Sequence, residues 1–203
     1  MKPVPVSSGL LYAGVVLLFA VCGACSAAFL SSSGYSTFPD QIPPMLPIPF
    51  ALLCALLFMR SWRAIVAVPL MVAVWVIAFM AAGSVGMLSH DVLAPGCVGG
   101  LIGGVGLVLC AATCHRRLLS PMYVFGGAVI GSLSALEFVP WVSLYYSHLG
   151  RPDDPRGDLE LPLMLAFAIW QVAVGAYLYK IARDSDEEAQ PRDSAGLTIV
   201  RLN

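Results

Sequence analysis

Long apolar blocks separated by short polar stretches dominate this chain, and the blocks show no alternation of polar and apolar positions. Each block has about 18 to 25 residues, which as a helix is enough to cross a hydrocarbon core of about 30 Å. Backbone amides find no partners in lipid, so a helix is the structure expected for each block. The sequence therefore predicts an all-α membrane bundle of six spans, at residues 10–30, 42–59, 64–88, 92–114, 121–139 and 161–182.

Prolines and polar residues mark several predicted helix ends. Ser120 followed by Pro121 predicts the start of the fifth span, and Pro162 follows an acidic residue at the start of the sixth. The second span is the weakest, because four prolines crowd its first half. Its regular helix is expected to begin only near Pro47 or Pro49, which leaves a short or tilted span.

The first span has an alternative interpretation as a cleaved secretory signal. Residues 10–21 resemble the apolar part of a signal, and Ser26, Ala27 and Ala28 resemble a cleavage site. Against this, only Lys2 is basic before the apolar run, and the run continues to residue 30. A retained first span is favoured, and cleavage is left open.

Basic residues are distributed unevenly between the two sides of the predicted bundle. With the N-terminus inside, only Arg151 and Arg156 of the 11 Lys and Arg residues fall outside. This positive-inside bias predicts that both termini are cytoplasmic. Short links between the second to fifth spans predict that sequential helices are antiparallel neighbours. The inner basic residues are Lys2, Arg60, Arg63, Arg116, Arg117, Lys180, Arg183, Arg192 and Arg201.

Composition supports the same architecture and excludes some functions. The 203 residues are 59% hydrophobic and 11% charged, whereas a soluble domain carries about 25% charged residues. A net charge of −1 gives no basic field for nucleic acid, so a nucleic-acid partner is excluded. The remaining residues, 183–203, are polar and are expected to form a disordered cytoplasmic tail.

Glycines with helical spacing are the most specific pattern in the chain. Gly96, Gly100 and Gly104 share one face of the fourth span, and Gly127 and Gly131 share a face of the fifth. Glycines four apart let a second backbone approach closely. Either a homo-oligomer interface, a pore lined by backbone, or packing within the chain would use them, and packing within the chain is favoured.

Few polar side chains interrupt the spans, and these are the candidates for an ion or substrate path. Glu137 lies in the last turn of the fifth span, and His90 and Asp91 lie in an outer turn. Gln171 is near the middle of the sixth span, where an amide needs a partner on a neighbouring helix. A structural role is favoured for Gln171.

Cysteines suggest two further kinds of site. Cys22 and Cys25 form a C-x-x-C pair, which would allow thiol redox chemistry, but no outer loop contains a cysteine to relay electrons. Cys110, Cys114 and His115 lie one helical turn apart, but no fourth ligand is evident for a metal. No metal site is predicted and the cofactor is left unknown.

Three classes of function fit this pattern. A non-catalytic subunit or scaffold with a membrane-protein partner or a second copy is favoured, since the spans are nearly free of charge. A small transporter or channel for a proton, cation or small solute is the first alternative, and a redox or lipid-modifying membrane enzyme is the second. Compact loops and Ala-, Gly- and Val-rich spans favour a bacterial inner membrane.

Overall fold

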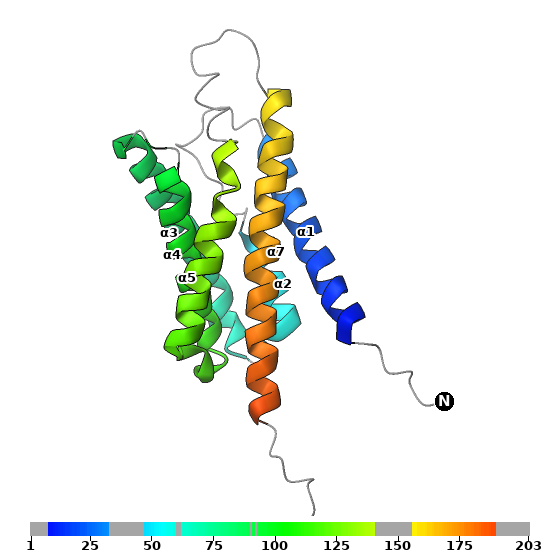
Figure 1. Ribbon diagram of the computed structural model, residues 1–203. Helices are drawn as coiled ribbons and strands as arrows, with labels where there is room; N and C mark the ends of the chain where they lie inside the picture. Colours follow the sequence, from blue (N-terminus) through cyan, green and yellow to red (C-terminus); the bar gives the residue numbers. More distant parts are fainter. Residues whose placement is uncertain are drawn as a thin grey trace, which may run out of the picture.

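The computed structural model describes residues 8–32, 47–59, 62–89, 91, 93–140 and 156–189, and these ranges form helices without any strand (Figure 1). The elements are α1 (Ser8–Ser32), α2 (Ile48–Phe58), α3 (Ala64–Ser89), α4 (Leu93–Ala112), the 3-10 turn η1 (Arg116–Leu119), α5 (Pro121–Ala135) and α7 (Arg156–Ala189).

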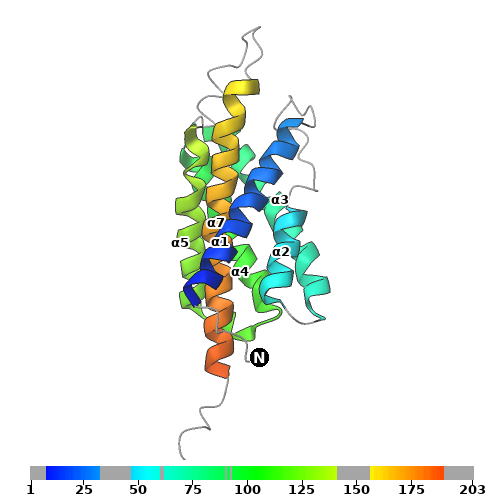
Figure 2. The same ribbon diagram turned by 90° about the vertical axis from the view of Figure 1, so that its right-hand side faces the viewer.

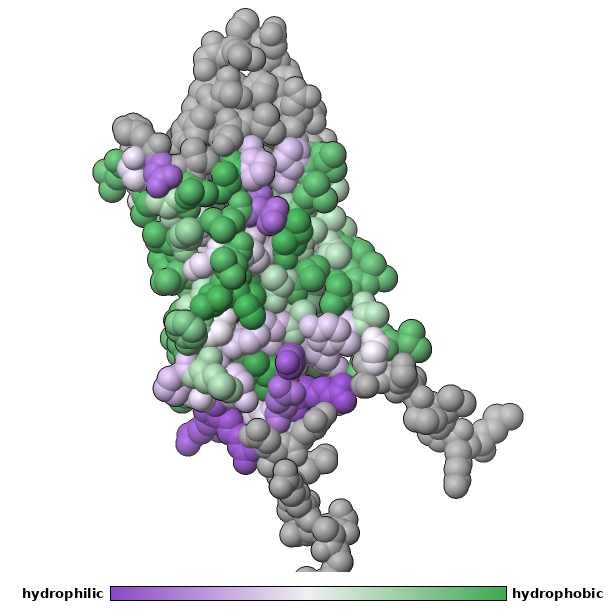
Figure 3. Space-filling view, in the orientation of Figure 1, coloured by the Kyte–Doolittle hydropathy of each residue, from purple (hydrophilic) through white to green (hydrophobic). Residues whose placement is uncertain are grey.

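Five stretches of these helices are long and apolar enough to cross a membrane: Gly9–Ala28, Ala64–Gly86, Leu93–Ala112, Pro121–Pro140 and Met164–Ser185. On the face shown in Figure 3, apolar residues predominate along the bundle, and hydrophilic residues gather mainly at its lower end. Such a surface is unfavourable in water, because large apolar side chains such as Leu56 and Ile65 remain more than three-quarters exposed. The chain is therefore a multi-pass membrane protein.

The helix of the second predicted span is short and begins at Ile48, next to Pro47, as its prolines predicted. α2 has 11 residues, which extend about 16 Å and cover roughly half of a hydrocarbon core. Its N-terminal proline pair, Pro47 and Pro49, sets where the helix begins. Residues 42–46 of the predicted span lie outside the described residues.

The helices alternate in direction along the chain (Figures 1 and 2). The first turn of α1 and the last turn of α7 lie at the same end of the bundle, together with the turn between α4 and α5. We call this the lower end. α1 and α3 both run away from it, so the chain between them returns to it, and α2 is the described part of that return.

Local chemistry explains where the helices begin. α5 starts at Pro121 with Ser120 at the N-cap position, although the Ser120 side chain makes no capping hydrogen bond. At the start of α4, the backbone amide of Leu93 donates to Oδ1 of Asp91 at 2.9 Å, so the Asp91 side chain caps the helix. A proline at the first helical position costs no hydrogen bond.

The last helix extends further than expected at both ends. α7 begins at Arg156 and continues to Ala189, so the first residues assigned to a disordered tail are helical. Ile181, Ala182 and Ser185 are buried, and this packing extends the helix past the predicted end at residue 182. The rest of the predicted tail, 190–203, lies outside the described residues.

Aromatic side chains form the core between the helices. The ring centroid of Phe19 on α1 lies 5.4 Å from that of Phe50 on α2, and the Phe50 centroid lies 5.9 Å from that of Trp170 on α7. One turn earlier on α7, the ring centroid of Phe167 lies 5.9 Å from that of Trp75 on α3. These ring contacts join helices that are distant in sequence.

Two groups of helices share this core. α4 packs extensively on both α3 and α5, whereas α1 packs mainly on α7 and less on α2. α7 also contacts α5, which links the two groups. The bundle therefore contains one sequential group, α3–α4–α5, and one pair made from the first and last helices.

Candidate functional site

The glycines of α4 and α5 lie directly against each other. A Cβ atom added at Gly100 would overlap the carbonyl of Gly131, and one added at Gly104 would overlap the carbonyl of Gly127. A Cβ added at Gly96 would lie 3.0 Å from the carbonyl oxygen of Ala135. The two backbones are therefore in contact over about two helical turns.

The adjacent glycine face of α4 packs on α3. A Cβ added at Gly99 would lie 2.9 Å from the Cβ of Ala82 and 3.1 Å from the carbonyl oxygen of Ala78. Two neighbouring helices of the same chain thus cover both faces of α4. A second copy of the chain could reach these glycines only if α3 or α5 moved away.

The pair of α1 and α7 is also held by close approach. A Cβ added at Gly23 would lie 2.6 Å from Cα of Ala168, and one added at Gly175 would lie 2.6 Å from the ring of Phe19. Helices this close leave room for small side chains only.

A buried polar group lies in this α1–α7 interface. Gln171 is fully buried, and its Nε2 group donates a hydrogen bond of 3.4 Å to Oγ of Ser26. The Ser26 hydroxyl in turn donates to the backbone carbonyl of Cys22 at 2.9 Å. The other amide atom, Oε1 of Gln171, has no hydrogen-bond partner. An unpaired acceptor at this depth costs about 1 to 3 kcal/mol.

The chemistry of this group is limited to hydrogen bonding. An amide carbonyl can accept a hydrogen bond from water, a hydroxyl or an amine, but it does not titrate. The Ser26 hydroxyl donates its proton to the carbonyl oxygen of Cys22, and Oε1 of Gln171 can accept a hydrogen bond from a neutral donor.

The ion-path candidates do not converge. Asp91 is exposed at the turn between α3 and α4, where it caps α4, and Glu137 is exposed in the turn after α5. Gln171 is buried in the middle of α7, and among the described residues no hydrogen bond or ion pair joins it to either acid. His90 lies outside the described residues.

All six cysteines are free thiols. Cys22 is half-buried beside the core, whereas Cys25 is exposed on the outer side of α1. Cys97 is exposed on α4. No disulfide joins Cys22 and Cys25, which are the redox candidates.

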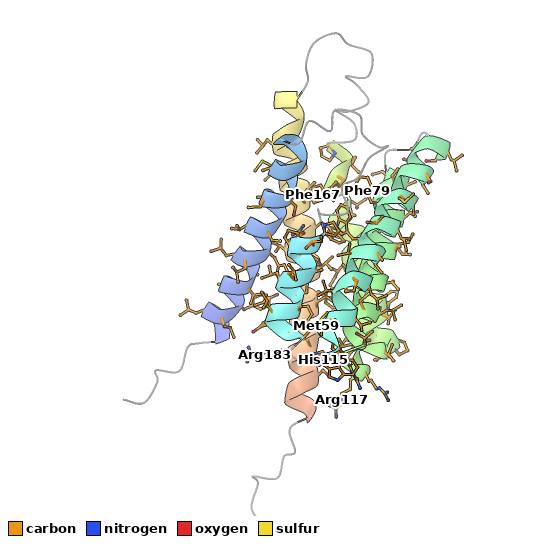
Figure 4. All side chains as sticks on the ribbon, turned by 180° about the vertical axis from the view of Figure 1, so that it is seen from behind. Met59, Phe79, His115, Arg117, Phe167 and Arg183 are labelled. Atoms are coloured by element: carbon orange, nitrogen blue, oxygen red, sulfur yellow. The ribbon has the colours of Figure 1, made fainter. Side chains whose placement is uncertain are left out.

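The lower end contains polar contacts between neighbouring turns. Nε2 of His115 donates to the backbone carbonyl of Phe58 at 2.8 Å, and a guanidinium N–H of Arg63 donates to the carbonyl of Thr113 at 3.3 Å. His115 is thereby engaged with α2, and no group of three or more metal-ligating side chains occurs within the ranges that the structure describes. Figure 4 shows His115 close to the end of α2 at this end of the bundle.

Sequence reasoning identified Gln171 but missed its partner. Ser26 stood out only as part of a cleavage-site pattern, and nothing in the sequence pairs a serine on the first span with a glutamine on the last. The bond of His115 to Phe58 was missed for a similar reason, because a backbone carbonyl carries no sequence signal.

Comparison with known proteins gives no assignment: no protein-family model matches the chain, and no curated protein or solved structure is significantly similar to it.

Proposed function

We propose that this chain is a non-catalytic subunit or scaffold of a membrane complex, with six crossings and both termini in the cytoplasm. The observation that carries this proposal is the chemistry of the buried interior. Among the side chains whose burial the structure describes, the buried polar ones are Ser26, Ser134, Gln171 and Ser185, and none of these four is ionisable. A path for ions or an acid–base mechanism would need titratable groups there.

The orientation is supported by charge. Figure 3 shows hydrophilic residues gathered at the lower end, where α1 begins and α7 ends. The exposed basic residues that the structure describes belong to the turns and the helix end found there: Arg63, Arg116, Arg117, Lys180 and Arg183. A crossing at the short α2, added to the five long apolar stretches, would give an even number of crossings. A bacterial inner membrane fits the compact turns and the positive-inside distribution.

The outer surface offers apolar contacts to a partner. Leu17 of α1, Ile77 of α3 and Phe125 of α5 are 64%, 57% and 71% exposed. These helices face lipid on three sides, and a partner would replace lipid on one of them. The small-residue faces of α4 are already covered, so this outer surface is the proposed docking region.

Affinity purification in mild detergent tests the proposal. We expect a partner or a second copy in stoichiometric amount, and we expect one of Leu17→Ala, Ile77→Ala and Phe125→Ala to lose it without lowering the unfolding temperature. The other two variants are the matched controls. A chain that stays monomeric and alone after cross-linking in native membranes contradicts the proposal.

A small transporter is the second candidate, favoured by the unpartnered Oε1 of Gln171. A transported molecule with a hydroxyl or amine could complete that hydrogen bond if α1 moved. Proton- or cation-dependent flux in vesicles that is lost in Glu137→Gln or Gln171→Leu would favour this candidate over the first.

A further inference from the structure

The first turn of α2 lies in the interior of the membrane. The last residue of α2, Phe58, is bonded to His115 at the lower end, so the helix begins farther up, about midway along the bundle (Figure 4). Phe50 in the first turn contacts the ring of Phe19, which is near the middle of the apolar stretch Gly9–Ala28. A helix that begins at this depth presents backbone N–H groups where lipid offers no acceptor.

Two backbone amides of this turn have no acceptor in their own helix. The first helical hydrogen bond runs from the amide of Ala51 to the carbonyl of Pro47. The amides of Ile48 and Phe50 precede this bond, and Pro47 offers no side-chain cap. Pro49, which lies between them, has no N–H group. The start of α2 therefore supplies two hydrogen-bond donors at the positive end of its helix dipole.

The buried amide of Gln171 belongs to the same part of the bundle. Its neighbour Trp170 contacts Phe50, with ring centroids 5.9 Å apart. Gly175, one turn after Gln171 on the same face of α7, lies against Phe19, whose ring also contacts Phe50. The start of α2 thus lies beside the α1–α7 interface at the level of Gln171. The unpaired Oε1 atom and the two amides share this region.

These groups have a chemical complement. The carbonyl of Gln171 needs one donor, and the two amides need acceptors. A hydroxyl group has one donor and two acceptor lone pairs, whereas an ammonium group only donates and a carboxylate only accepts. The nearby rings of Phe19, Phe50 and Trp170 are buried, which favours a ligand with an apolar body.

We infer that the Gln171 amide and the first turn of α2 bind the hydroxyl group of an apolar alcohol within the bilayer. The hydroxyl donates to Oε1 of Gln171 and accepts from the amides of Ile48 and Phe50. α1 packs less on α2 than on α7, so the alcohol can enter from lipid between α1 and α2. The inference rests on neither function proposed above, because the alcohol would be a resident ligand in a scaffold and the cargo in a transporter.

Photolabelling of the full-length protein in neutral detergent tests the inference. The probe is a long-chain alcohol that carries a diazirine near its hydroxyl group, and peptide mass spectrometry locates the crosslinks. We expect crosslinks in the first turn of α2 and in the part of α7 around Gln171. Decanol should compete at a concentration about tenfold lower than decyl methyl ether, which lacks the hydroxyl donor.

Gln171→Leu removes the acceptor and should abolish most of the preference for decanol over the ether. Ser134→Ala is the matched control, because Ser134 is buried on α5 with its hydroxyl bonded to the carbonyl of Ile130, and it should keep the preference. An equal loss in this control, or an unchanged preference in folded Gln171→Leu, overturns the inference.

The wild-type protein keeps the test decisive where Gln171→Leu does not fold. Equal competition by decanol and by the ether shows that the hydroxyl is not recognised and overturns the inference. Crosslinks confined to α3, α4 and α5 also overturn it. Because the readout is binding, neither the loss of a protein partner nor the absence of flux in vesicles would be mistaken for failure of this site.

Discussion

The α4–α5 and α1–α7 interfaces both bring two backbones into contact, but they differ in what lies beside the glycines. Between α4 and α5, Gly100 and Gly104 meet the carbonyls of Gly131 and Gly127. Between α1 and α7, Gly23 meets Ala168, and one turn away Gln171 is buried with an unpaired carbonyl. The first interface is complete as it stands, whereas the second leaves a hydrogen bond unmade.

The two interfaces also differ in the helices that surround them. α4 lies between α3 and α5 and cannot move without disturbing both. α1 lies at the edge, held by α7 and by the short α2. Close packing without polar groups is expected to hold α3, α4 and α5 rigidly together. A buried polar group on an edge helix is where we expect a ligand to bind or the helix to move. The following variants test this contrast.

The largest effect is expected at Gly100. Gly100→Leu would drive a side chain into the Gly131 carbonyl, and we expect a loss of about 3 kcal/mol or more in the free energy of unfolding, or no folded protein. Gly14→Leu is the matched control, because a Cβ there meets nothing within 4 Å. Thermal unfolding in detergent measures both. Equal free energies of unfolding for the two variants would contradict the rigid packing of α4 on α5.

A smaller loss is expected at Gly23. Gly23→Leu also creates a backbone clash, but α1 can move outward because only α7 and α2 hold it, so about 1 to 3 kcal/mol is expected. Displacement of α1 should expose Cys22 and Cys54, which are half-buried and buried. Intact mass after maleimide treatment would show additional modified cysteines relative to Gly14→Leu. An unchanged count would show that α1 does not move.

At Gln171 the expected change in stability has the opposite sign to that of the glycine variants. Gln171→Leu removes a buried unpaired carbonyl and keeps the volume, so stability should stay equal or rise by about 1 kcal/mol. Ser26→Ala leaves the amide without its partner and should cost about 0.6 to 1 kcal/mol. Equilibrium unfolding measures both. A large loss in Gln171→Leu would mean that the amide is required for packing.

The smallest effect concerns Asp91, outside both interfaces. Asp91→Ala removes the cap of α4 and should cost about 1 kcal/mol, while Asp91→Asn keeps an acceptor oxygen and should cost almost nothing. If Asp91→Asn instead abolishes a transport activity without a change in unfolding temperature, its charge has a role that capping does not explain.

Much of the fold follows from residues that are close in sequence. Continuous apolar runs gave the long helices, and Pro121 and Pro47 marked helix starts that the structure retains. The prolines of the second span also predicted that its regular helix is short, and α2 has 11 residues. The extension of α7 to Ala189 depended on packing of Ser185 and Ile181, which a polar tail does not indicate.

The candidate site was less predictable than the helices. Periodicity identified the face of α4 that carries Gly96, Gly100 and Gly104, but it could not say that α5 would cover this face. Gln171 was visible as a polar residue in an apolar run, whereas its pairing with Ser26 is a tertiary contact between chain ends. Such contacts depend on the arrangement of all the helices and leave no local pattern.

The pairing of the first helix with the last has a consequence for synthesis. The contact between Ser26 and Gln171 joins residues 145 positions apart, which a ribosome takes roughly 7 to 29 s to translate. During that interval α3, α4 and α5 emerge in order and can assemble from neighbouring segments. α1 has to wait in the lipid, or beside an insertion factor, until its companion arrives.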